Sequence, residues 1–163
     1  MKNSTLQSRF RGCLLAGAAG DALGYPVEFE SVERIRSKYG ERGITQYDRS
    51  IDPQQKYAVI TDDTQMTLFT AEGLLEDKRR RNGTSTLDTA WGGMYEAYLD
   101  WLYTQESKKK PKVGYTKLMG ESRLHERRAP GNTCLAALRS GNCGSHPIRH
   151  RLADAHRGKG IRR

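Results

Sequence analysis

The sequence is poor in apolar residues and contains no long apolar run. Only 36% of its 163 residues are apolar and 29% are charged, whereas about 45–50% are apolar in an ordinary domain when glycine is included. No segment approaches the roughly eighteen consecutive apolar residues of a membrane span. The run Cys13–Ala19 is short, contains glycine and is soon followed by Asp21, so we interpret it as part of a buried helix and not as a signal peptide. We expect one domain with a modest core and no membrane partner.

Cysteine is also scarce. The three cysteines, Cys13, Cys134 and Cys143, are odd in number and form no CxxC pair. This pattern argues against a disulfide scaffold and favours a reducing, cytoplasmic location.

Positive charge is concentrated at the C-terminus. The net charge is +9, and residues 139–163 contain six arginines and one lysine against a single acid, Asp154. A basic tail can bind nucleic acid, but no recognition motif accompanies it, so nucleic acid is the weakest of the candidate partners. No apolar periodicity continues beyond Gly141. We therefore expect residues 1–141 to form the folded part and 142–163 to be a basic tail that is disordered or non-native.

Strand signals are almost absent, which predicts an all-α fold. Helical patterns cover residues 8–23, 31–39, 61–77 and 86–104, and a further helix is expected between Asn132, as its cap, and Gly141. Pro26 ends the first helix, because proline lacks an N–H donor. Ser31 and Gly40 are the expected start and stop of the second. The packing stripes of the two long helices are expected to contain Met66, Phe69, Thr70, Gly73 and Leu74, and Trp91, Met94, Tyr95, Tyr98, Trp101 and Leu102.

The stretch Thr61-Asp62-Asp63 opens the clearest helix and has two interpretations. Thr61 is a good N-cap, and acids in a first helical turn are stabilised by about 0.3–1 kcal/mol each. A hydroxyl and two carboxylates at a loop–helix junction are also the hard oxygen ligands that Mg²⁺ prefers. The tripeptide alone leaves both interpretations open.

Asp21 and Glu28 are the second candidate pair. Asp21 lies in a segment of small and apolar residues, where a carboxylate needs partners to be buried. It either bonds to backbone groups beyond its helix or supports a polar cleft that Glu28 also reaches. Glu28 by itself would be read as a surface residue.

Three segments together resemble successive parts of the ADP-ribosylglycohydrolase family. They are "RGCLLAGAAGDALGYPVEF", "ITDDTQMTLFTAEGLL" and "RRAPGNTCLAALRSG". The resemblance runs from about Phe10 to Gly141, and its second segment is the most specific. It implies an all-α fold and a site with two Mg²⁺ ions, and it implies as substrate an ADP-ribosylated protein or a small molecule that contains ADP-ribose.

The resemblance also implies roles for individual residues. Thr61, Asp62 and Asp63 match the family's first metal motif, and Glu28 resembles the glutamate beside the metals that assists catalysis. Asp21 resembles a structural acid and takes a supporting role. The segment 130–133 either lines the cleft or only starts a helix. The implied reaction is metal-assisted cleavage of an N- or O-glycosidic bond at C1 of the distal ribose.

The sequence departs from the family in one important respect. Relatives carry a glycine-rich segment, of which 142–144 resembles only the start, and a second acidic motif of the Asp-x-Asp-Thr type, which is absent here. We therefore expect a truncated or frameshifted hydrolase with a partial metal site and impaired turnover. The alternatives are a non-catalytic module that binds ADP-ribose or a toxin, as an immunity protein would, and a basic nucleic-acid-binding protein.

Overall fold

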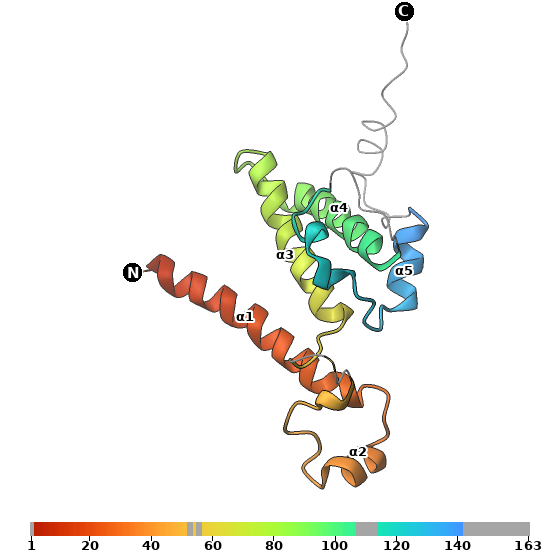
Figure 1. Cartoon of the computed structure of the whole chain (residues 1–163). Helices are drawn as coiled ribbons and strands as arrows, with labels where there is room; N and C mark the ends of the chain where they lie inside the picture. Colours follow the sequence, from red (N-terminus) through yellow and green to blue (C-terminus); the bar gives the residue numbers. More distant parts are fainter. Residues whose placement is uncertain (1, 52–53, 55–56, 107–113, 142–163) are drawn as a thin grey trace, which may run out of the picture. The chain divides into compact units, whose positions relative to one another are not determined.

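The computed structural model describes residues 2–51, 54, 57–106 and 114–141 (Figure 1), and these contain helices and turns but no strand. The expected all-α class is confirmed. The helices are α1 Lys2–Gly24, α2 Val32–Tyr39, α3 Asp62–Arg80, α4 Leu87–Glu106 and α5 Asn132–Arg139, with 3₁₀ turns η1 Tyr25–Val27, η2 Arg49–Ile51, η3 Leu118–Gly120 and η4 Ser122–His125. No helix of the described part is long and apolar enough to cross a membrane.

The chain forms two compact units, Met1–Thr67 and Leu68–Arg163, whose boundary falls within α3. The basic tail expected at 142–163 and the lysine-rich segment 108–112 lie outside the described residues.

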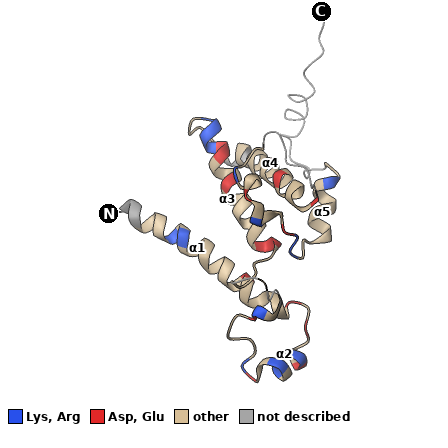
Figure 2. Ribbon diagram, viewed as in Figure 1, with Lys and Arg blue, Asp and Glu red and all other residues tan. Residues whose placement is uncertain are grey.

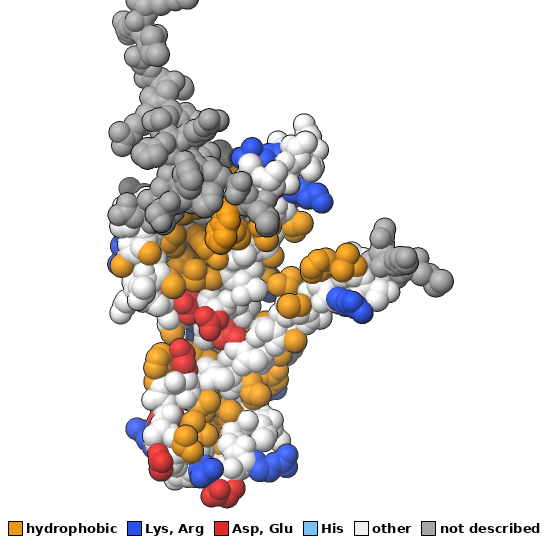
Figure 3. All heavy atoms as spheres, turned by 180° about the vertical axis from the view of Figure 1, so that it is seen from behind, with side chains coloured by type: hydrophobic (Ala, Val, Ile, Leu, Met, Phe, Trp, Pro, Cys, Tyr) orange, Lys and Arg blue, Asp and Glu red, His pale blue; other side chains and the backbone are white. Residues whose placement is uncertain are grey.

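The first unit contains α1, α2 and the start of α3. As expected, α1 ends at Gly24, where η1 begins with a proline in its first turn. Ser31 caps α2 by accepting a hydrogen bond from the Arg34 N–H, and Gly40 follows the helix with a φ of 86°. Hydrophobic side chains are exposed along α1, including Leu6, Phe10 and Leu15 (Figure 3).

In the second unit, α3 and α4 cross in close backbone contact. A Cβ atom added to Gly73 would lie 2.8 Å from the Gly93 carbonyl oxygen, and one added to Gly93 would lie 2.7 Å from the Gly73 carbonyl oxygen. The absence of side chains at both positions is what permits this approach. The core around the crossing consists of Phe69, Ala97, Trp101, Met119, Leu124 and Leu135, all buried.

The predicted packing stripes are correct in their centres and wrong at their edges. Phe69 and Trp101 are fully buried, but Leu74 is 40% exposed and Trp91 is 61% exposed. Asp77, the last residue of the expected helix 61–77, is buried although it is charged. At the last helix, Asn132 is the first helical residue and not its cap, because Gly131 occupies the cap position without a side-chain hydrogen bond.

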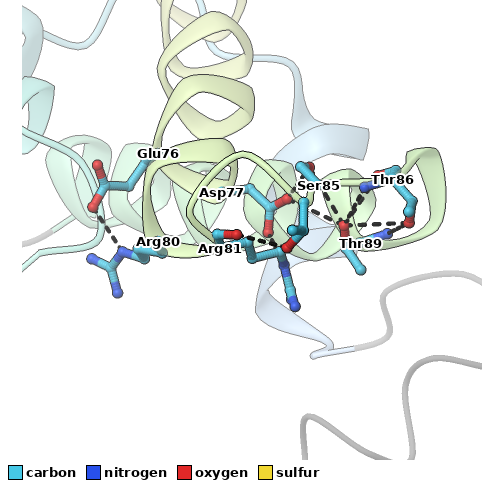
Figure 4. Close-up of polar contacts among 8 residues, drawn as sticks. Glu76, Asp77, Arg80, Arg81, Ser85, Thr86 and Thr89 are labelled. Carbon is cyan, nitrogen blue, oxygen red and sulfur yellow. Dashed lines mark hydrogen bonds and ion pairs between the residues drawn. The ribbon is translucent and has the colours of Figure 1, made fainter.

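Asp77 is buried because the turn after α3 and the first turn of α4 supply hydrogen-bond donors to it (Figure 4). Its carboxylate accepts hydrogen bonds from Arg81 Nε at 2.7 Å, from Thr89 Oγ1 at 3.3 Å and from the Ser85 hydroxyl. The neighbouring Glu76 pairs with Arg79 and Arg80, so the basic end of α3 carries its own acids (Figure 2). The helix therefore continues beyond its expected end at residue 77, and Arg79 and Arg80 in this continuation are paired with Glu76.

Two further carboxylates fasten residues 114–120 to the helices. Asp100, buried on α4, accepts hydrogen bonds from the Thr116 N–H at 2.6 Å and from its hydroxyl at 2.8 Å. Glu72 on α3 accepts from the N–H groups of Lys117 and Leu118 at 3.0 and 2.9 Å, which caps η3. Burial raises the pKa of Asp100, and the Thr116 hydrogen bonds oppose that rise.

Candidate functional site

The start of α3 is built around Thr61. This residue is 3% exposed, and its hydroxyl oxygen accepts a hydrogen bond from the Asp63 N–H at 3.2 Å. That contact satisfies one of the amide donors that the first helical turn leaves without an intrahelical acceptor. The predicted capping role of Thr61 is thus confirmed.

Asp21, near the C-terminal end of α1, holds the same helix start from 40 residues away. Its Oδ2 accepts hydrogen bonds from the Thr61 N–H at 2.8 Å, the Thr64 N–H at 3.3 Å and the Thr64 hydroxyl at 2.5 Å. Its Oδ1 accepts from the Thr61 hydroxyl at 2.7 Å. The carboxylate therefore faces the positive end of the α3 dipole, which offsets the cost of removing it from water.

Thr64 was absent from the residues that the sequence singled out. It is 6% exposed, and both its N–H and its hydroxyl bond to Asp21. In the sequence it resembles an ordinary residue of a first helical turn. The only available signal was the spacing of two threonines three residues apart, which places both at the same end of one helix.

Glu28 follows η1 and is exposed. Its pKa is raised by partial desolvation and then by the negative charges of Asp63, Asp62 and Asp21. The Coulomb interaction is long-ranged, so this repulsion indicates that four carboxylates share one region without showing that they touch. A cation bound there would relieve the repulsion.

The two acids of the motif lie on the first turn of α3. Asp62 is half-buried and Asp63 is exposed. Together with Thr61 they provide hydroxyl and carboxylate oxygens, the donor chemistry that suits Mg²⁺. However, within the described residues no three Asp, Glu, His or Cys side chains converge closely enough to hold a metal ion. The oxygens of these residues therefore suit Mg²⁺ in chemistry, but the described residues do not form a complete coordination shell.

The first unit thus brings Asp21 into contact with Thr61, which directly precedes Asp62 and Asp63, and desolvation together with the charges of all three acids raises the pKa of Glu28. The segment 130–133 belongs to the second unit, where it forms the start of α5.

These features define a class of protein: a helical protein in which a half-buried aspartate holds an acid-rich helix start. The profile of the ADP-ribosylglycohydrolase family matches residues 2–160 of the sequence. The chain belongs to this family. The match extends beyond Gly141, into residues that lie outside the described part.

Among curated proteins, the chain is similar to an uncharacterized protein of Archaeoglobus fulgidus. The two are 41% identical over 71 residues, which cover 44% of this chain and 23% of the relative. The chain thus matches less than a quarter of that relative's length. No solved structure matches the chain significantly.

Proposed function

We propose that the start of α3 binds Mg²⁺ and that this site serves the removal of ADP-ribose from a modified protein or small molecule by cleavage of its glycosidic bond. The observation that carries the proposal is the Asp21–Thr61 hydrogen-bond pair, which fixes a hydroxyl oxygen directly before two adjacent carboxylates. Family membership supports a glycohydrolase reaction in general.

Different residues of the chain would bind the metal ion, hold the site in place and accept a proton. Thr61, Asp62 and Asp63 would hold the ion, and Asp21 keeps their helix start in place. Bound Mg²⁺ would orient ribose hydroxyls and polarise the reacting centre. Glu28 is exposed, and its raised pKa makes it a better proton acceptor than an ordinary glutamate. We propose it as the group that takes a proton from the attacking water.

The test compares two double variants in the presence of Mg²⁺ and an ADP-ribosylated protein. Asp62→Ala with Asp63→Ala removes the site's acids, and Glu33→Ala with Glu41→Ala removes two exposed acids from elsewhere in the first unit. We expect Mg²⁺ binding to be lost in the first variant and kept in the second. Equal Mg²⁺ binding by both variants would contradict the proposed site.

A non-catalytic binding role is the second candidate. It is favoured by one observation: within the described residues, no three acidic, histidine or cysteine side chains converge closely enough to hold a metal ion. With only part of a metal shell, turnover would be low even if ADP-ribose binds. Binding of ADP-ribose without release from the modified protein supports this role, whereas release that depends on Asp62 and Asp63 supports the hydrolase.

A further inference from the structure

We propose that Asp21 is a positioning residue that sets the direction of the Thr61 hydroxyl, so that Thr61 presents a lone pair and not a proton to a cation. This inference rests on the Mg²⁺ site proposed above and assigns Asp21 a role beyond structural support. It follows from the donors and acceptors around one hydroxyl group.

The hydroxyl of Thr61 has its hydrogen-bond partners fixed on two sides. A threonine hydroxyl offers one proton and two acceptor lone pairs. The proton goes to Asp21 Oδ1 at 2.7 Å, because a carboxylate can only accept. One lone pair receives the Asp63 N–H at 3.2 Å. The remaining lone pair is the one that can face a metal ion.

The other oxygen of Asp21 cannot change its role. Oδ2 receives two backbone N–H groups, from Thr61 at 2.8 Å and from Thr64 at 3.3 Å, and the Thr64 hydroxyl as well. Backbone N–H groups are donors only, so Oδ2 must remain an acceptor. Asp21 therefore accepts from two backbone amides with Oδ2, and with Oδ1 it fixes the direction of the Thr61 hydroxyl proton.

This asymmetry makes Asp21→Asn an informative change. The asparagine oxygen has to take the Oδ2 position, where the amides point, which places its NH₂ group opposite Thr61 Oγ1. The NH₂ group would then donate to that oxygen, which also accepts from Asp63 N–H. Both lone pairs of Thr61 would be occupied and its proton would turn toward the cation. The shape of the site is kept, but the Thr61 hydroxyl would present a proton to the cation where it had presented a lone pair.

Two other effects of Asp21→Asn have to be separated from this one. The change removes a negative charge near the site, which weakens cation binding through space. It also weakens the tie between α1 and α3, which lowers stability. Neither effect depends on the Thr61 hydroxyl. Thr61→Val removes that hydroxyl, and combining the two substitutions therefore distinguishes action through Thr61 from action by charge or by folding.

The experiment measures Mg²⁺ binding to the full chain by calorimetry. We expect Asp21→Asn and Thr61→Val each to weaken Mg²⁺ binding by about 10–100-fold, the usual effect of altering a partner of a metal ligand. The double variant should bind more weakly than Thr61→Val only by the smaller, through-space effect of the missing charge, so that its total loss is less than the product of the two single losses. Thr61→Ser should bind as the wild type does. Asp48→Asn is the matched control, because Asp48 also accepts several hydrogen bonds in the first unit but contacts Tyr39 and Ser50.

Each outcome has one meaning. Wild-type affinity in Asp21→Asn overturns the inference, and so does a full further loss when Asp21→Asn is added to Thr61→Val. A loss in Asp48→Asn equal to that in Asp21→Asn also overturns it, since destabilisation would then explain both. If the wild type binds no Mg²⁺, or if removing Asp62 and Asp63 leaves binding intact, the metal site itself is wrong and this inference falls with it.

Discussion

The α3–α4 crossing allows a stability prediction whose sign is set by local geometry. We consider Gly93→Ala. A Cβ atom at this position would lie 2.6 Å from the Asp77 Cβ and 2.7 Å from the Gly73 carbonyl oxygen. Real Cβ atoms do not approach other atoms this closely, and neither neighbour is the end of a flexible side chain. The two helices would have to move apart, away from the buried Phe69 and Trp101.

The magnitude follows from two opposing terms. Alanine is favoured over glycine in a helix interior by about 1 kcal/mol. Overpacking of a tight contact costs about 1–3 kcal/mol, and here the rigid neighbours place the cost at the upper end. We therefore expect Gly93→Ala to lower the free energy of unfolding by about 1–2 kcal/mol. For a chain of this size, that corresponds to a Tm lower by about 2–8 °C.

Thermal unfolding followed by far-ultraviolet circular dichroism measures the effect. The matched control is Gly12→Ala in α1, where an added Cβ meets no atom of the described residues within 4 Å. There only the helix-propensity term acts, so Tm should stay the same or rise. A Gly93→Ala protein as stable as the wild type, or more so, would refute the proposed close crossing.

Three further predictions concern carboxylates of the second unit. The Arg79 hydrogen bond lowers the pKa of Glu76 to about 2 from about 4.5. The stabilising contribution of Glu76 is therefore present above pH 4.5 and is lost as the pH falls toward 2. Denaturant unfolding at several pH values should show this loss of stability, and Glu76→Gln should reduce it. Asp77→Ala removes a buried acceptor of several hydrogen bonds and should lower the free energy of unfolding by roughly 2–3 kcal/mol, measured by urea denaturation. Glu72→Ala removes the cap of η3, so hydrogen exchange at the amides of residues 117–118 should become faster while exchange in α4 stays unchanged.

The helices were largely predictable because their signals are local. Pro26, Ser31 and Gly40 act within a few residues of where they stand, and the structure places helix boundaries beside all three. The edges of the packing stripes were not predictable in the same way. Periodicity assigns Trp91 to the core by its apolar character, yet it is 61% exposed. Asp77 is buried although it is charged, because its hydrogen-bonding partners come from the following turn.

In the candidate site, too, the features set by local interactions could be predicted from the sequence, and those set by distant contacts could not. The motif Thr61-Asp62-Asp63 could be located from the sequence, since helix capping and the preference for acids in a first turn are local effects. The presence of Asp21 among small and apolar residues predicted that it needs partners, but nothing local identified Thr61 and Thr64, 40 and 43 residues away. Four donors from one helix start now explain why this carboxylate can be half-buried.

The same four contacts explain why the role of Asp21 cannot be assigned from its burial alone. A carboxylate that satisfies the N–H groups at the start of α3 stabilises that helix whether or not a cation ever binds nearby. Its effect on a ligand depends only on Oδ1 and the Thr61 hydroxyl, one of the four contacts. Substitution by alanine would remove all four at once and confound folding with binding. Asparagine keeps the three contacts at Oδ2 and reverses the donor and acceptor in the contact with the Thr61 hydroxyl. It therefore tests the positioning role at the one hydrogen bond on which that role depends.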